Sequence, residues 1–232
     1  MIWDLPVPYR LLTRVHITRE TSNGKVGNWL HSHRLSLGKD EIDVHDGLVV
    51  TSLARTVSDL CRLTAPHEAL AIMDAGWRKL GSLDAVAECV DQAVGRVGIA
   101  NAKWALAHAD PLSESPGESI SRYWMIRAGI PAPVLQFEVR NGSGNLLGRA
   151  DFGWPDLGLL GEFDGRIKYD ELVPDGLTAA DVIMSEKHRE NQFRNEGYWV
   201  FRWGWRDLHD GLAFMSYLEE RITKRSQARR GI

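Results

Sequence analysis

The order of expected elements in the second half of the chain admits few folds. Two helices and four short apolar strands are expected there, in the order helix 115–128, strand 135–140, strand 147–152, strand 159–164, helix 178–196 and strand 198–203. Turn-forming residues such as Asn141-Gly142-Ser143-Gly144-Asn145 separate the first strands, which favours hairpins. This order predicts an α/β fold with an αβββαβ core, followed by an amphipathic helix over 207–223.

The first half of the chain has a different pattern, with strands before helices. Strands are expected over residues 14–18, 29–33 and 47–50, and helices are expected to begin at Ser52, Pro66 and Ser82, with a last one ending near His108. The polar stretch at 110–113 has turn chemistry and marks a boundary. We therefore expect a smaller β-then-α domain over residues 1–110 and a second domain over 111–232.

Two of the expected strands carry carboxylates where they end. Asp151 lies near the end of the second strand of the core, and Glu162 and Asp164 share one face of the third. If these strands pair as a hairpin, the three acids converge, and like charges then raise one another's pKa. A hard cation such as Mg²⁺ or Mn²⁺ stabilises such a cluster and activates water for work on phosphate. The alternative is a set of solvent-facing strand ends or ion-pair partners, for example of Arg149.

Composition excludes several classes of function. The net charge of −3 gives no global basic field, so any nucleic-acid site must be a local patch. The N-terminus shows no secretory pattern, and no run approaches the ~18 apolar residues of a membrane span. We therefore expect a cytoplasmic protein with no membrane partner, in which Cys61 and Cys89 are reduced core residues. His31 and His33 share a strand face, but two histidines alone make a poor zinc site.

The second half resembles the PD-(D/E)XK nucleases, and in particular the very-short-patch-repair-like endonuclease domains of actinobacteria. The matching segments are Ser113-Glu114-Ser115-Pro116-Gly117-Glu118, Gly129-Ile130-Pro131, Arg149-x-Asp151-Phe152, Glu162-x-Asp164-Gly165, Lys168-Tyr169, Glu186-Lys187-x-Arg189-Glu190 and Arg202-Trp203-x-Trp205-x-Asp207-Leu208. The resemblance covers about half of the chain and is specific as a set.

This resemblance implies Mg²⁺-dependent cleavage of DNA, with Asp151 and Glu162 as metal ligands. The family pattern has Lys at the position of Asp164, which here is either a third ligand or a cap of the turn at Gly165. The missing cation would then come from Lys168 in the following loop or from Lys187 on the next helix.

Other residues have both a structural and a functional interpretation. Glu118 is either the acidic half of a helix capping box or part of the metal shell. The candidates for DNA phosphate contacts are Arg149, Arg189, Arg202 and Arg206. Alternation places Trp199, Phe201 and Trp203 on one buried strand face, and the basic tail 223–230 is expected to fray.

The first half resembles the linker domain of AbiEi-type antitoxin proteins. The matching residues are Asp46-Gly47-x-x-Val50-Thr51-Ser52-x-x-Arg55-Thr56-x-x-Asp59-Leu60. In that family a winged helix precedes this domain, and the present chain begins too late to hold one. The resemblance therefore implies a lost DNA-reading head or a start codon assigned downstream of the true one.

Two functions are consistent with these patterns. The first is a metal-dependent DNA endonuclease acting in repair or defence, with DNA as its partner. The second is a catalytically inactive nuclease-fold protein that regulates by binding DNA or a cognate toxin. The retained Asp151, Glu162 and Asp164 favour the enzyme, whereas the unmatched Lys position favours the regulator.

Overall fold

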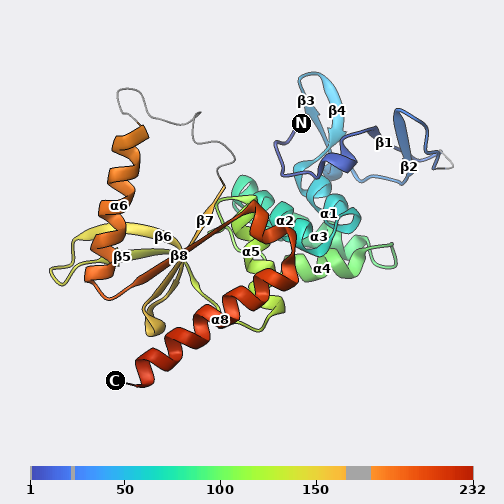
Figure 1. The fold of residues 1–232 in the computed structure, drawn as a ribbon. Coiled ribbons are helices and arrows are strands. Elements are labelled where there is room, and N and C mark those ends of the chain that lie inside the picture. The colour runs from blue at the N-terminus through green and yellow to red at the C-terminus, as the bar shows by residue number, and fades with distance from the viewer. Residues whose placement is uncertain (1, 22–23, 166–178, 232) are drawn as a thin grey trace. The chain divides into compact units, whose positions relative to one another are not determined.

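The computed structural model describes residues 2–21, 24–165 and 179–231 and shows an α/β protein. The chain divides into two compact units, Met1–Pro116 and Gly117–Ile232, which are described separately below (Figure 1). No helix among the described residues combines the length and apolar character needed to cross a bilayer.

The first unit places two small sheets before four helices. In chain order its elements are η1 Tyr9–Leu11, β1 Val15–Arg19, β2 Leu30–Arg34, η2 Lys39–Glu41, β3 Ile42–His45, β4 Leu48–Thr51, α1 Leu53–Leu63, α2 Pro66–Leu80, α3 Asp84–Gln92 and α4 Ile99–His108. Strands β1 and β2 pair in parallel, and β3 and β4 form an antiparallel hairpin. The helices enclose one apolar core, in which Cys61 and Cys89 are buried and unpaired, as expected of reduced core residues.

Local chemistry explains the helix starts of the first unit. Ser52 is the N-cap of α1 and its hydroxyl accepts a hydrogen bond from Arg55 N at 3.4 Å, and Pro66 opens α2 at a position where its missing N–H is not needed. The helix expected to begin at Ser82 is α3, which begins at Asp84 with Leu83 as its N-cap, and Ser82 Oγ accepts a hydrogen bond from Asp84 N at 3.1 Å.

The second unit is built on a four-stranded sheet. Its elements are α5 Pro116–Arg127, β5 Val134–Arg140, β6 Leu146–Trp154, η3 Pro155–Leu157, β7 Leu159–Asp164, α6 Ala179–Asn195, β8 Trp199–Gly204, α7 Trp205–His209 and α8 Gly211–Arg230. The strand order is β5-β6-β7-β8, with the first two pairings antiparallel and the last parallel. The expected αβββαβ order is therefore confirmed for the described residues.

Each face of this sheet has its own apolar cluster. On one face, Phe152, Trp203 and their neighbours pack against side chains of α5 and α8, among them Met125 and Phe214. On the other face, Leu160 and other strand residues pack against Phe193 of α6. The sheet is thus covered on both faces, as is usual for parallel strands such as β7 and β8.

Three expectations about the C-terminal segment were wrong. The single helix expected over 207–223 is two helices, because Asp210 caps α8 by accepting hydrogen bonds from Leu212 N and Ala213 N at 3.1 Å. The tail does not fray but continues α8 to Arg230. Trp199 is 65% exposed rather than buried, and the guanidinium of Arg225 lies over its ring.

Candidate active site at the ends of β6 and β7

The pairing of β6 with β7 brings the first two candidate carboxylates together. Phe152 pairs with Gly161, so the next residues along the two strands are Asp151 and Glu162. The carboxylate of Asp151 reaches across to β7, where its Oδ2 accepts a hydrogen bond from Phe163 N at 2.7 Å. The Asp151 carboxylate therefore lies at the backbone of the residue that follows Glu162.

The surroundings of Asp151 disfavour its charged form. Burial above all, together with the nearby Glu118 and Glu162 carboxylates, raises its pKa from 3.8 to about 6. The hydrogen bond from Phe163 N and the charge of Arg189 act in the opposite direction without cancelling the rise. A buried carboxyl group that feels two other carboxylates is the electrostatic signature of a cluster that favours an added cation.

Close packing positions Glu118 at the start of α5. A Cβ on Gly117 would lie 1.9 Å from the Phe163 ring, so only glycine lets the first turn of α5 lie this close to β7. Ser121 locks the helix further along, because its hydroxyl donates to Gly117 O and accepts from Trp203 Nε1, both at 2.7 Å. Glu118 is consequently 7% exposed within electrostatic range of Asp151.

A strained residue on β5 also contacts Glu118. Gln136 has a φ of 50°, in the left-handed region that a non-glycine residue in a strand rarely adopts, and its Nε2 donates to Glu118 Oε2 at 2.9 Å. Gln136 was not identified from the sequence, because nothing in the local pattern reveals a positive φ inside a strand.

Two arginines hold the Glu162 carboxylate, which is 8% exposed. Arg202 Nε donates to Oε2 at 2.9 Å, and Arg189 Nη2 lies 3.0 Å from Oε1. The Arg189 contact is an ion pair without good hydrogen-bond geometry. The buried Oε1 therefore accepts no hydrogen bond from the residues that the structure describes. Arg202 also donates to Glu190 Oε2 at 2.6 Å, and its hydrogen bond holds the Glu190 pKa below the usual range.

The structure places the other candidates in different surroundings. Lys187 is exposed on α6 and lines a shallow hollow with Glu190, Arg194 and Arg202. Asp164 is half-buried at the end of β7, whereas Arg149 and Arg206 are exposed on β6 and α7. Lys168 lies outside the described residues. Arg189 and Arg202, expected at phosphate, are instead engaged with Glu162 and Glu190.

These carboxylates partly fit a hard divalent cation. Asp151, Glu162 and Glu118 offer only oxygen ligands, which Mg²⁺ and Mn²⁺ prefer, and Glu162 Oε1 is a buried acceptor with no hydrogen-bond donor among the described residues. Within the described parts of the chain, however, the acids do not form a group of three with all ligand atoms within 4.8 Å. The arrangement therefore supplies the ligand chemistry, while Glu162 is neutralised by arginine.

Comparison with known proteins gives relatives without an assigned activity. The chain is 30% identical over 158 residues to two proteins of Mycobacterium tuberculosis, "Uncharacterized protein Rv2248" of strain ATCC 25618 / H37Rv and "Uncharacterized protein MT2308" of strain CDC 1551 / Oshkosh. The match covers 62% of this chain and 58% of each relative, so the chain spans less than two thirds of their length. No family model and no solved structure matches the chain.

Proposed function

We propose that the second unit is a metal-dependent DNA endonuclease domain of the PD-(D/E)XK type. The observation that carries the proposal is the β6–β7 pairing, which sets Asp151 beside Glu162 while α5 brings Glu118 within electrostatic range. The αβββαβ order of elements, which the resemblance implies, supports it. The proposed substrate is DNA, and the proposed setting is the cytoplasm, in repair or defence.

In this proposal Asp151 and Glu162 hold Mg²⁺ or Mn²⁺, with Glu118 and Asp164 as further candidates. A bound divalent cation would supply an activated water and neutralise charge on the scissile phosphate. Gln136 fixes Glu118 through its amide hydrogen bond, and the backbone of Phe163 fixes Asp151. These two hydrogen bonds would fix Glu118 and Asp151 before any substrate arrives.

The arginines at Glu162 have a second role in this proposal. A DNA phosphate beside the Glu162 carboxylate would meet the guanidinium groups of Arg189 and Arg202. A planar guanidinium can donate two hydrogen bonds to the oxygens of one phosphate. Lys187, on the same helix as Arg189, is one candidate for the cation that the family pattern places where this chain has Asp164. Lys168 is the other candidate for that cation.

Cleavage of supercoiled plasmid by the full chain tests the proposal. We expect nicking that requires Mg²⁺ or Mn²⁺ and that Asp151→Asn or Glu162→Gln abolishes, because each change removes a ligand charge and keeps the side-chain shape. Asp156→Asn is the matched control, since Asp156 is exposed on η3 and should cleave like wild type. Equal nicking by wild type and Asp151→Asn would assign any activity to a contaminant and end the proposal.

A second candidate function has its own observation. The pairing of Glu162 with two arginines, together with an acid at the family lysine position, favours a nuclease fold retained as a DNA-binding or toxin-binding scaffold. Mobility-shift titrations discriminate the two. A scaffold binds DNA equally with and without Mg²⁺ and never cuts it, whereas the enzyme cuts.

A further inference from the structure

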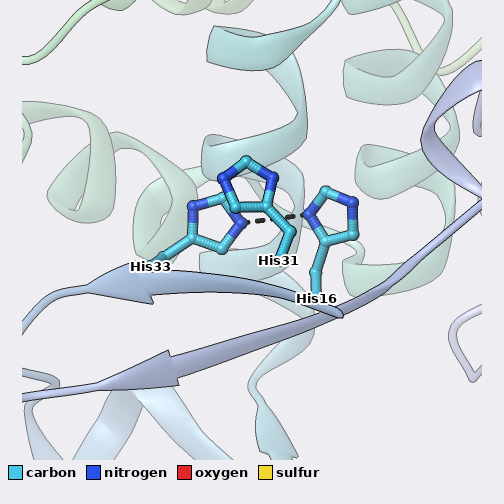
Figure 2. Close-up of side chains that lie close together, drawn as sticks. All are labelled: His16, His31 and His33. Carbon is cyan, nitrogen blue, oxygen red and sulfur yellow. Dashed lines mark hydrogen bonds between the residues drawn. The ribbon is translucent and has the colours of Figure 1, made fainter. Parts of the chain in front are cut away.

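Parallel pairing of β1 with β2 assembles a histidine cluster in the first unit. His16 on β1 is the register partner of His31 on β2, and His33 lies two residues further along β2 on the same face. Figure 2 shows the three imidazole rings gathered on one side of the two strands. Sequence spacing reveals the His31–His33 pair, but His16 joins it only through a pairing across the chain.

The three rings lie close enough to share one ion. His16 Nδ1 is 3.0 Å from His33 Nε2, and the ring centroids of His31 and His33 are 4.1 Å apart. One ligand nitrogen from each ring can be chosen so that all three lie within 4.8 Å of one another. In a tetrahedral site with the usual Zn–N distance of about 2.0–2.1 Å, the ligand nitrogens are roughly 3.3 Å from one another. The distances between the histidine nitrogens would therefore have to change by about 0.3–1.5 Å to bind the ion.

We propose that His16, His31 and His33 bind a divalent transition metal ion of the zinc class. Neutral imidazole nitrogens are ligands for Zn²⁺, Cu²⁺, Ni²⁺ and Co²⁺ and poor ligands for Mg²⁺, so this site differs in chemistry from the carboxylates of the second unit. Three histidines leave one coordination position to water. His16 is exposed, which gives the ion and that water a path to the site.

His33 also lies near a carboxylate, that of Asp59. Asp59 is already engaged with Arg55 and Arg62, so the three imidazoles form the proposed ligand set.

The site would also stabilise the segment that carries it. An isolated two-stranded sheet is marginal in water, and β1 and β2 form such a sheet with no third strand among the described residues. A metal bridging His16 to His31 and His33 would link the two strands directly. Metal binding free energy then becomes folding free energy for strands β1 and β2.

Zinc titration of the full chain, stripped of metal and competed with a chromophoric chelator, tests this site. The titration uses the Asp151→Asn background so that the carboxylates of the second unit contribute less. We expect one tightly bound Zn²⁺ per chain. Each of His16→Ala, His31→Ala and His33→Ala should lower the affinity for Zn²⁺ by at least roughly 100-fold, more than the 10–100-fold typical of changes to residues that only support a ligand. His209→Ala is the matched control, since His209 is exposed on α7 and should leave affinity unchanged.

A second readout separates metal binding from misfolding. Zn²⁺ should slow amide hydrogen exchange in β1 and β2 of the parent chain and leave it unchanged in His16→Gln, which keeps a polar side chain of similar reach. Cobalt substitution should give the intense visible absorption of a tetrahedral site. Failure to bind Zn²⁺ at micromolar concentration, or binding that survives all three histidine changes, overturns the proposal.

Discussion

At the Asp151 carboxyl, the raised pKa has a consequence for stability. Its folded-state pKa of about 6, against 3.8 for the free group, means that the folded protein binds more protons than the unfolded chain between these values. The free energy of unfolding therefore falls as pH rises from about 4 to about 6. A shift of this size corresponds to ~3 kcal/mol for a fully buried group, and we expect about 1–2 kcal/mol for the partly exposed Asp151.

Asp151→Asn should consequently stabilise the chain at pH 7.5 and have little effect at pH 4.5. The amide keeps an oxygen to accept from Phe163 N but never bears the charge that burial and the Glu118 and Glu162 carboxylates disfavour. Urea unfolding followed by tryptophan fluorescence measures the difference between variant and wild type at each pH. A difference that does not change with pH would show that the Asp151 carboxyl is not perturbed.

The polar residues of the motif that resembles AbiEi linkers have a structural explanation. Arg55 is 2% exposed and donates to Glu41 Oε1 at 2.6 Å and to Asp59 Oδ2 at 2.7 Å. Thr51 and Thr56 share a hydrogen bond of 2.7 Å beside the Ser52 cap. These side chains fix the hairpin to α1, so the pattern reports a fold more directly than a function.

Arg55→Met should therefore destabilise the first unit by about 3–5 kcal/mol, because it leaves the buried Glu41 carboxylate without its partner. Arg19→Met, at an exposed position of β1, is the control and should stay within about 0.5 kcal/mol of wild type. Thermal unfolding of both variants measures the effect. Equal melting temperatures would mean that the Arg55 cluster does not stabilise this unit.

At the scale of elements, helix α8 ends by docking on a turn. Arg225 donates to the carbonyls of Leu157 and Gly197, both at 2.9 Å, and Arg229 donates to Asp156 O at 2.6 Å. These carbonyls belong to η3 and to the turn between α6 and β8, so the basic residues expected in a frayed tail are structural. The two arginines donate hydrogen bonds to backbone carbonyls that would otherwise bind water.

Arg225→Ala should destabilise the second unit by about 1–2 kcal/mol, the loss of two partly exposed charge-assisted hydrogen bonds and the contact with the Trp199 ring. Lys224→Ala is the control on the same helix, because the ion pair that Lys224 makes with Glu220 lies at the surface. Hydrogen exchange in η3 and in the turn before β8 should increase in the first variant alone; unchanged exchange there would mean that the tail is not docked.

Helices and strands bounded by turn residues, a capping residue or proline could be predicted from the sequence. Turn residues 141–145, the Ser52 cap and Pro66 are set by neighbours within a few positions, and the elements beside them were predicted within one or two residues. Strand β3 was missed, although Asp46 and Gly47, with φ values of 50° and 77°, form the turn that marks a hairpin. That signal was present in the sequence and could have revealed it.

The candidate sites show where prediction from sequence stops. The alternation of Asp151 and Glu162 predicted that they meet, and the strand pairing brings them together. The Arg202 that neutralises Glu162 lies 40 residues away, and the His16 that completes the histidine cluster lies 17 residues from His33. Such contacts depend on strand register and helix packing, which no local pattern fixes.

At the scale of the whole chain, the cores predict how it can be divided. One apolar cluster contains only residues of the first unit, and the other two contain only residues of the second. Each unit therefore buries its own core, which is the property of a domain that folds alone. Fragments 1–114 and 115–232 should both unfold cooperatively, as measured by circular dichroism.

Residues 110–113 are tied to helix α2 of the first unit by hydrogen bonds. Asp110 N donates to Asp74 Oδ1 at 2.8 Å, and Arg78 Nη1 donates to Ser113 O, so residues 110–113 belong to the first unit. A fragment ending at residue 108 loses both ties and leaves the fully buried Asp74 without that donor, and it should be less stable than 1–114 by about 1–3 kcal/mol. Zinc binding should stay with 1–114 and DNA cleavage with 115–232. An unfolded 1–114, or equal stability of the two N-terminal fragments, would show that the units are not independent in this way.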